Sequence, residues 1–267
     1  MSSRNRSATL AMVPLLFGVL AGTDAVAQAP QGVAQKPPAA NAHQHRRGPK
    51  QLVLVGSEGA EITLWKPDLS TLPLQSKMGT VTIPTTGVDN YHAVVARKDW
   101  GDTVESVIRY LYMHGKPSGQ SPTRLTGVLK SELEIVPDPI PREHFRYYSD
   151  QEWGFLVRFG DEPLANVPVV METDNGSRVE GVTDTGGRVR LHIPDDFPDV
   201  IEGERDRRAA ELSVSAEHVA RGITYQSMLS AEYRVNQGHW RSFELGLAVA
   251  GIGMIAGGFI GRKRGGN

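Results

Sequence analysis

Short runs of alternating apolar and polar positions fill the chain from residue 51 to residue 130. The runs "QLVLVG", "EITLWK", "TVTI" and "YHAVVAR" are separated by glycine, proline and asparagine, which is typical of strands joined by turns. This pattern predicts an amino-terminal β-rich unit over residues 51–130. Residues 102–115 are ambiguous, because their apolar positions fit a helix while their β-branched and aromatic content suits a long strand. Residues 115–125 are expected to form a loop.

A second set of runs covers residues 131–238. The run "EWGFLVRFG" places Trp153, Phe155, Val157 and Phe159 on one side of a strand. The runs "AELSVSAEHV" and "ITYQSMLSAEYRV" surround Gly222 and predict a pair of strands that fold back on each other. About seven short strands at this spacing predict a β-sandwich. The sequence leaves open whether the two units are separate domains or parts of one sheet system.

The stretch "DNGSRVEGVTDTGGRVRLHIPDD", residues 174–196, holds two turn signals. Asn175-Gly176 is a strong signal for a tight turn between strands, and residues 183–187 predict the next turn. We therefore interpret the stretch as a hairpin. Asp184 is expected to hydrogen-bond the backbone of its own turn rather than to bind a metal or act in catalysis.

The stretch from Phe159 to Pro194, "FGDEPLANVPVVMETDNGSRVEGVTDTGGRVRLHIP", resembles carboxypeptidase-regulatory-like domains of the transthyretin type. Residues Glu132–Val235 are similar to a periplasmic uncharacterised family that is related to extracytoplasmic components of bacterial cobalt and nickel transporters. The matching motifs are turn signatures and not catalytic ones. The resemblance implies an immunoglobulin-like or transthyretin-like β-sandwich, a place outside the cytoplasm and a divalent-metal uptake system as partner.

The amino terminus has the features of a signal peptide over residues 1–27. Arg4 and Arg6 precede an apolar run from Leu10 to Ala21, and small residues at 25–27 supply a cleavage site. An uncleaved membrane anchor is the alternative. Residues 28–50 are rich in proline, glutamine and alanine with almost no large apolar residue, which predicts a disordered linker.

The carboxyl terminus predicts a single transmembrane helix over residues 243–261. Only Glu244 is charged in this stretch, and at 1.5 Å per residue it reaches about 28 Å, close to the thickness of a bilayer core. Arg262, Lys263 and Arg264 follow directly, so the positive-inside rule places residues 262–267 in the cytoplasm. The body of the protein is then periplasmic and tied to the cytoplasmic membrane by one span.

Small residues recur along this helix at Gly246, Ala250, Gly253, Gly257 and Gly261. Spacings of three and four place them on one narrow face, where a second helix can approach closely. We expect the face to bind an integral membrane protein or a second copy of the chain. A plain anchor that happens to be rich in glycine is the alternative.

Composition excludes several classes of protein. The chain has no cysteine, so it has no disulfide framework and no thiol chemistry. Its net charge of -1 argues against a nucleic-acid partner. No nucleophile elbow, zinc-protease motif, phosphate-binding loop or dinucleotide fingerprint occurs, and we do not predict an enzyme.

Histidine is the residue type that offers candidate ligands for a divalent transition metal. His92 and His144 are each flanked by aromatic residues, which can supply the apolar shell of a metal site. In the linker, His43 and His45 flank Gln44, and paired imidazoles bind Cu(II) or Ni(II). The alternative is that these are hydrogen-bonded or surface histidines.

The leading hypothesis is a membrane-anchored periplasmic binding or accessory module for nickel or cobalt uptake or for assembly of a membrane complex. One alternative is a structural, self-associating envelope protein that binds no ligand. Another is an extracytoplasmic hydrolase whose active site cannot be recognised in a single sequence.

The glycine face of the tail can be tested by substitution. Replacing Gly257 with Ile should weaken helix association by about 1–2 kcal/mol, roughly tenfold, because close packing in lipid needs the missing side chain. Ile255→Leu, on another side of the helix, should change little. An in-membrane dimerisation reporter measures both, and equal association by the wild type and both variants would leave the helix as a plain anchor.

Overall fold

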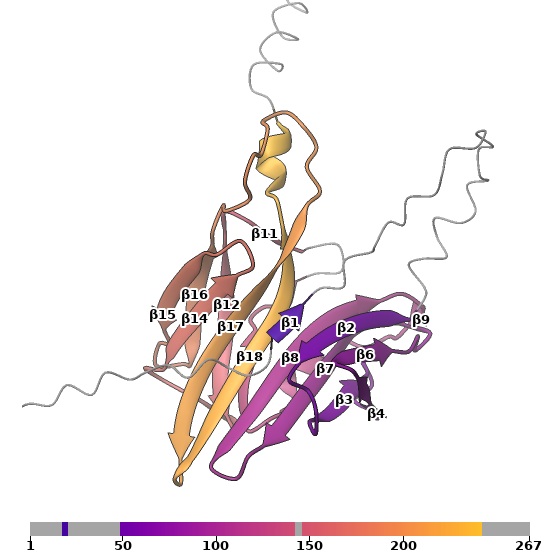
Figure 1. Cartoon of the computed structure of the whole chain (residues 1–267), viewed down its shortest axis with the longest axis vertical. Coiled ribbons are helices and arrows are strands. Elements are labelled where there is room, and N and C mark those ends of the chain that lie inside the picture. Colours follow the sequence, from indigo (N-terminus) through magenta and orange to yellow (C-terminus); the bar gives the residue numbers. More distant parts are fainter. Residues whose placement is uncertain (1–17, 21–48, 142–145, 242–267) are drawn as a thin grey trace, which may run out of the picture.

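The computed structural model describes residues 18–20, 49–141 and 146–241 (Figure 1). The regular structure of this part of the chain is mostly β-strand, which confirms the predicted all-β class. None of its helices has the length and apolar character of a membrane span. The predicted span 243–261 lies outside these residues, as do most of the predicted signal peptide and nearly all of the linker.

One large sheet organises the fold. Its strand order is β15-β14-β17-β18-β8-β7-β3-β4, with β11 beside β18 and β9 beside β7. The strands are β3 (Glu61–Trp65), β4 (Thr71–Leu74), β7 (Val88–Asp99), β8 (Thr103–Met113), β9 (Lys116–Pro117), β11 (Tyr147–Tyr148), β14 (Pro168–Thr173), β15 (Arg178–Val182), β17 (Ala209–Ala220) and β18 (Ile223–Arg234).

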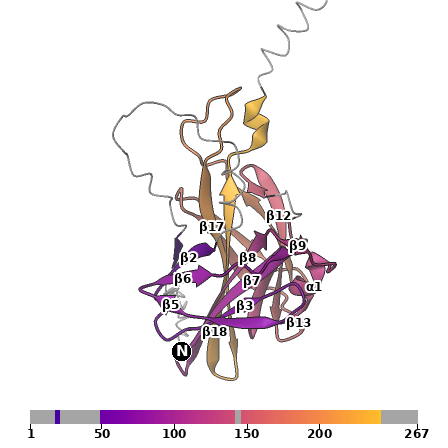
Figure 2. The ribbon, with the colours of Figure 1, turned by 90° about the vertical axis from the view of Figure 1, so that its right-hand side faces the viewer.

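Two smaller sheets cover opposite faces of the large sheet (Figure 2). The amino-terminal sheet contains β1 (Gly18–Leu20), β2 (Lys50–Val55), β5 (Ser76–Lys77) and β6 (Thr80–Ile83). The carboxyl-terminal sheet contains β10 (Leu133–Pro137), β12 (Gln151–Phe159), β13 (Glu162–Pro163) and β16 (Arg188–Ile193). Two short helices complete the elements of the described residues, α1 (Pro122–Gly127) and the 3₁₀ helix η2 (Gln237–Trp240).

Each small sheet encloses its own core against the large sheet. Under the carboxyl-terminal sheet, Phe155 and Val157 are fully buried with Trp153 and Phe159 packed beside them, so the predicted apolar face of β12 is confirmed. The other core joins β2 and β6 to the opposite face, where Val107 and Met228 lie. The large sheet is therefore buried on both faces along its middle strands.

The ambiguous segment 102–115 is a strand. β8 pairs in antiparallel with β7 and in parallel with β18. Its neighbouring residues Val107 and Ile108 are both almost fully buried, although they point to opposite faces. A strand that is covered on both faces loses the simple alternation of apolar and polar residues, which explains why its periodicity resembled that of a helix.

The parallel pairing of β8 with β18 also answers the open question about domains. The register runs from Thr103–Thr224 to Arg109–Ser230 and makes strands of both predicted units neighbours in one sheet. The predicted hairpin around Gly222 is confirmed, since β17 and β18 pair along their full length. The chain thus has one continuous sheet with two attached layers.

The prediction that residues 174–196 form one hairpin is wrong after Val182. β15 pairs with β14 through the Asn175-Gly176 turn, whereas β16 pairs with β12 in the carboxyl-terminal sheet. A Cβ on Gly181 would lie 2.7 Å from the side chain of Val189, so β15 and β16 face each other across the core. Alternation shows which side of a strand is buried but not which sheet the strand joins.

The connection between β15 and β16 is fixed by its own side chains. Asp184 accepts hydrogen bonds from the backbone N–H groups of Gly186 and Arg188, at 2.8 and 2.9 Å, as expected. The Thr183 hydroxyl donates to the carbonyl of Leu164 at 2.7 Å and accepts from the N–H of Val167 at 2.9 Å. The chain therefore passes here from the large sheet to the carboxyl-terminal sheet.

The expected loop over residues 115–125 is also partly wrong, because it contains the start of α1. Ser121 caps this helix by accepting the N–H of Thr123 at 3.3 Å, and Pro122 opens it. Proline suits the first helical position because its missing N–H would have no partner there. Leu125 then anchors the helix in a core with Tyr91 and Ile140.

Two glycines with positive φ test the crossing between the sheets. At Gly187, φ is +72° and an added Cβ would lie 2.7 Å from the backbone oxygen of Val157, whereas at Gly176, φ is +94° with nothing within 4 Å. Gly176→Ala should cost about 1–2 kcal/mol from backbone strain alone. Gly187→Ala should cost about 1–3 kcal/mol more, because of the collision. Urea unfolding measures both, and equal losses would contradict this packing.

Candidate functional site

His92, a predicted metal ligand, has a structural role. It is fully buried at the start of β7. Its Nε2 lies 2.8 Å from the Thr86 hydroxyl and its Nδ1 lies 3.0 Å from the carbonyl oxygen of Asn90. Because the carbonyl can only accept, Nδ1 carries the proton and Nε2 accepts from Thr86. Burial lowers the pKa of His92 and keeps the ring neutral. Both nitrogens therefore have hydrogen-bond partners within the protein, and the assignment of His92 as a metal ligand stays a prediction.

The other candidate ligands do not form a site within the described residues. No group of three or more histidine, aspartate or glutamate side chains there could hold a metal ion. His144, His43 and His45 lie outside those residues, as do the helix positions Gly246, Ala250, Gly253, Gly257 and Gly261. Distant histidines in the described part each have their own neighbour, for example His114 beside Asp89 and His192 beside Asp150.

One cluster brings serine, aspartate and histidine together. Asp195 accepts from the Ser149 hydroxyl at 2.7 Å and lies 2.8 Å from Nε2 of His239. The carboxylate therefore stands between the serine and the histidine, whereas a catalytic triad needs the histidine in the middle to take the serine proton. Asn236 also binds the backbone and the hydroxyl of Ser149. The cluster fastens η2 to the fold.

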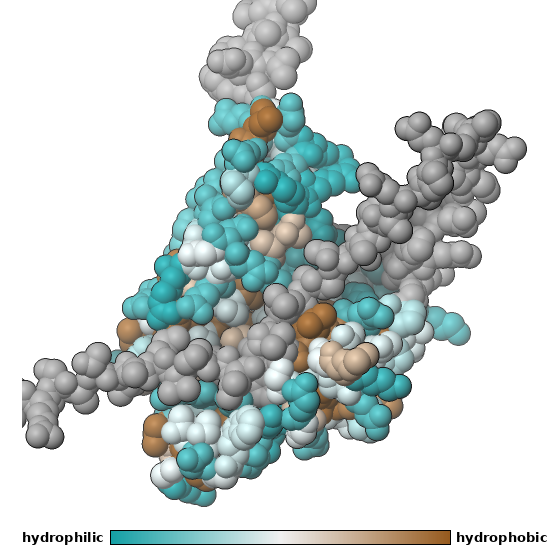
Figure 3. Space-filling model, viewed as in Figure 1, coloured by the Kyte–Doolittle hydropathy of each residue, from teal (hydrophilic) through white to brown (hydrophobic). Residues whose placement is uncertain are grey.

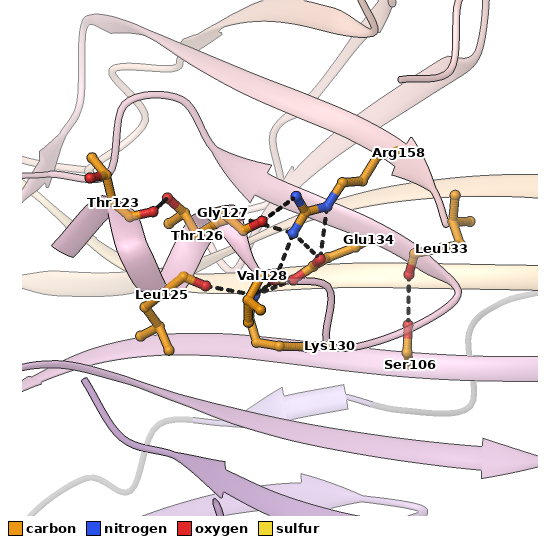
Figure 4. Close-up of polar contacts among 10 residues, drawn as sticks. All are labelled: Ser106, Thr123, Leu125, Thr126, Gly127, Val128, Lys130, Leu133, Glu134 and Arg158. Carbon is orange, nitrogen blue, oxygen red and sulfur yellow. Dashed lines mark hydrogen bonds and ion pairs between the residues drawn. The ribbon is translucent and has the colours of Figure 1, made fainter. Parts of the chain in front are cut away.

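A buried ionic cluster lies where the two predicted units meet (Figure 4). Glu134 on β10 contacts Lys130 and Arg158, each at 2.6 Å, and the side chains of Glu134 and Lys130 are 0% exposed. Burial lowers the pKa of Lys130, which the charge of Glu134 opposes. Two cations share one carboxylate in this cluster, and backbone carbonyl oxygens satisfy their remaining donors.

Those carbonyls belong to the end of α1 and the residues after it. Arg158 donates to the carbonyls of Thr126 and Val128 at 3.0 and 2.7 Å, and Lys130 donates to Leu125 at 3.0 Å (Figure 4). Cations at a helix carboxyl terminus satisfy carbonyls that have no partner in the helix. The ionic cluster thus clamps α1 to the carboxyl-terminal sheet.

A groove opens where β8 and β18 separate. Their register ends at Arg109–Ser230, and beyond it β18 pairs with β11 instead. The β7–β8 and β17–β18 hairpins lie side by side at the lower end of Figure 1 and diverge upward, so the groove lies in the fork between them. Its volume is about 780 Å³, which is within the range of ligand sites. We call it the fork groove.

Cations outnumber anions around the fork groove. Its positive residues are Lys50, Arg109, Arg146, Arg205, Arg207 and Arg234, and its negative residues are Asp206 and Glu232. Arg109 is also neutralised by a bidentate contact with the nearby Glu211. Six cations against three anions leave a surplus of three positive charges, while the whole chain carries -1.

Several of these cations contact other residues of the groove. Lys50 donates to the carbonyl of Tyr112 at 2.7 Å, and burial together with the charge of Arg109 lowers its pKa. Arg146 is about half exposed and lies 3.9 Å from Glu232, which Arg234 already contacts at 2.7 Å. The guanidinium of Arg205 lies 4.9 Å from the ring of Trp240. Arg146 therefore has the weakest ion pair among these contacts.

Aromatic residues form much of the remaining wall: Tyr91, Tyr110, Tyr112, Tyr147, Tyr148 and Trp240. The hydroxyl of Tyr147 is buried and has no hydrogen-bond partner among the described residues. Burial also raises the pKa of Tyr147, so this hydroxyl stays protonated and can donate. A buried donor without a partner is costly.

No motif in the sequence predicted the fork groove. Its residues come from at least six separate stretches of the chain, from Pro49 to Trp240. Residues 138–150 contain β11 and four of the groove residues. The dense arginine and tyrosine content of "REHFRYY" was the available signal. Elsewhere the visible face is mostly polar, with small separate apolar spots (Figure 3).

Comparisons with known proteins assign no family. No protein-family model matches the chain, and no curated protein matches it. Among solved structures, it is similar to a Ca²⁺-stabilised adhesin with which an Antarctic bacterium binds ice, with 14% identity and a TM-score of 0.27. The match covers 72% of this chain and 45% of the adhesin. At this TM-score the likeness does not define a shared fold.

The ionic cluster can be tested with a matched pair of carboxylates. Glu134→Gln should cost about 3–5 kcal/mol of stability, because it leaves Lys130 and Arg158 buried without a counter-charge. Glu132→Gln should cost about 0–1 kcal/mol, since Glu132 pairs with Arg97 at a position that is 38% exposed. Chemical unfolding of both variants gives the difference, and similar losses would refute the clamp.

Proposed function

We propose that this protein is a membrane-anchored periplasmic binding module and that the fork groove is its site for an anionic ligand. In this proposal residues 1–27 direct export, residues 243–261 anchor the protein and residues 262–267 lie in the cytoplasm. Residues 131–238 form a transthyretin-like sandwich that carries one wall of the groove. The glycine face of the anchor binds an integral membrane partner or a second copy.

The observation that carries the proposal is the surplus of positive charge in the fork groove. Like charges held close together repel each other, and a groove focuses their field. Arginine in particular offers planar, charge-assisted hydrogen bonds that match carboxylate and phosphate groups. An anionic ligand relieves the repulsion and supplies acceptors for the guanidinium groups.

The two alternative functions explain fewer features of the described residues. A structural protein without a ligand gives no reason for the surplus of cations or for the unpaired hydroxyl of Tyr147. A hydrolase needs a nucleophile beside a base, and Asp195 separates the serine from the histidine in the cluster described above. An accessory role in nickel or cobalt uptake rests on the family resemblance. A cationic groove would serve such a system through its protein partner or an anionic carrier.

Binding of simple anionic probes tests the proposal. Full-length protein in detergent is titrated calorimetrically with oligogalacturonate, tripolyphosphate and an acidic octapeptide, with maltoheptaose as the neutral control. We expect at least one anionic probe to bind, with affinity that falls as salt screens the charges. The double variant Arg146→Glu, Arg207→Glu should weaken binding at least about tenfold, because the two substitutions remove the surplus.

A variant with the same change in charge serves as the control. Lys77→Glu with Arg190→Glu places the reversal on β5 and β16, outside the fork groove. It should bind like the wild type. Failure of every anionic probe to bind, or an equal loss in both double variants, would overturn the proposed site.

A further inference from the structure

We infer that the fork groove binds an extended acidic peptide, which adds as a strand to the edge of β8. This inference rests on the proposed function and specifies its ligand. Strand addition to a sheet edge is a recurring way to recognise peptides, with backbone hydrogen bonds for affinity and side-chain contacts for specificity.

The edge is the last part of β8. From Tyr110 to Met113 this strand pairs with β7 on one side. On the other side its pairing with β18 stops at Arg109, and no strand of the described residues replaces it. Four residues at about 3.3 Å each give roughly 13 Å of edge. The opposite wall of the fork is β11, which pairs with β18.

A side chain now occupies the place of a neighbouring strand. The ammonium of Lys50 donates to the Tyr112 carbonyl at 2.7 Å, where an added strand would offer a backbone N–H. An incoming peptide can take this carbonyl with its own N–H. The released ammonium then has a carboxylate of the peptide as its partner. The side-chain hydrogen bond of Lys50 to the carbonyl is exchanged for a backbone hydrogen bond, and an ion pair is gained.

The surrounding charge selects an acidic peptide. Arg146, Arg205 and Arg207 lie around the same groove, against Asp206 and Glu232. The chain's own linker is a poor occupant, because residues 28–48 contain no aspartate or glutamate and include Lys36, Arg46 and Arg47. Repulsion by the groove disfavours that segment. A glycan or polyphosphate satisfies the charges but cannot supply backbone N–H groups to β8.

Backbone methylation separates strand addition from simple charge attraction. The probe is a fluorescent octapeptide of alternating glutamate and threonine, and its binding to full-length protein in detergent is followed by polarisation. Two further peptides carry N-methyl groups on all glutamates or on all threonines. Their charge is unchanged, but one alternate set of N–H groups is lost in each. At least one methylated peptide should bind about tenfold more weakly than the parent.

Protein variants and competitors complete the test. Arg146→Gln should weaken the parent peptide several-fold, and Arg190→Gln, on the exposed side of β16, should not. If both methylated peptides bind like the parent, or if oligogalacturonate binds better than the peptide, strand addition is overturned while the anionic site stands. If no anionic probe binds, both proposals fail. A concentration-dependent dimer that Arg146→Gln abolishes would make a second copy the occupant and would also overturn the inference.

Discussion

The parallel contact between β8 and β18 is the constraint on which the rest of the structure depends. Strands that are remote in sequence meet there, from Thr103–Thr224 to Arg109–Ser230, and make one sheet from two hairpins. A small sheet packs on each face of this large sheet, so the two cores lie on opposite faces. Where the contact ends, the hairpins diverge and leave the fork groove. The same pairing therefore joins the halves of the protein and sets the position of its candidate site.

Local patterns in the sequence predicted the elements that depend on local chemistry. The apolar face of β12, the β17–β18 hairpin and the turn at Asp184 follow from alternation and turn residues within a few positions. Partners in space were not predictable in this way. β16 reads as the second arm of a hairpin, yet it pairs with β12. The helix α1 is shorter than two turns, and only its Ser-Pro start marks it.

The candidate site was less predictable than the fold. His92 stood out because aromatic residues flank it, but the same burial gives both of its nitrogens partners inside the protein. No motif in the sequence singled out Lys130 and Glu134, and in the structure they are completely buried beside Arg158. The fork groove draws single residues from many strands, and its charge surplus does not exist in any one segment. Such a site appears only when the strand order is known.

The fastening of η2 has a mechanical consequence. Asn236 binds Ser149, His239 contacts Asp195 and accepts the N–H of Gly203, and Trp240 binds the carbonyl of Asp206. A force applied to the chain after Arg241 acts on these hydrogen bonds before it acts on β18. They lie on the loops that flank β17 and β11, so the load spreads into the carboxyl-terminal half of the sheet. Trp240 and Asp206 also line the fork groove, so part of this load passes through one wall of the fork.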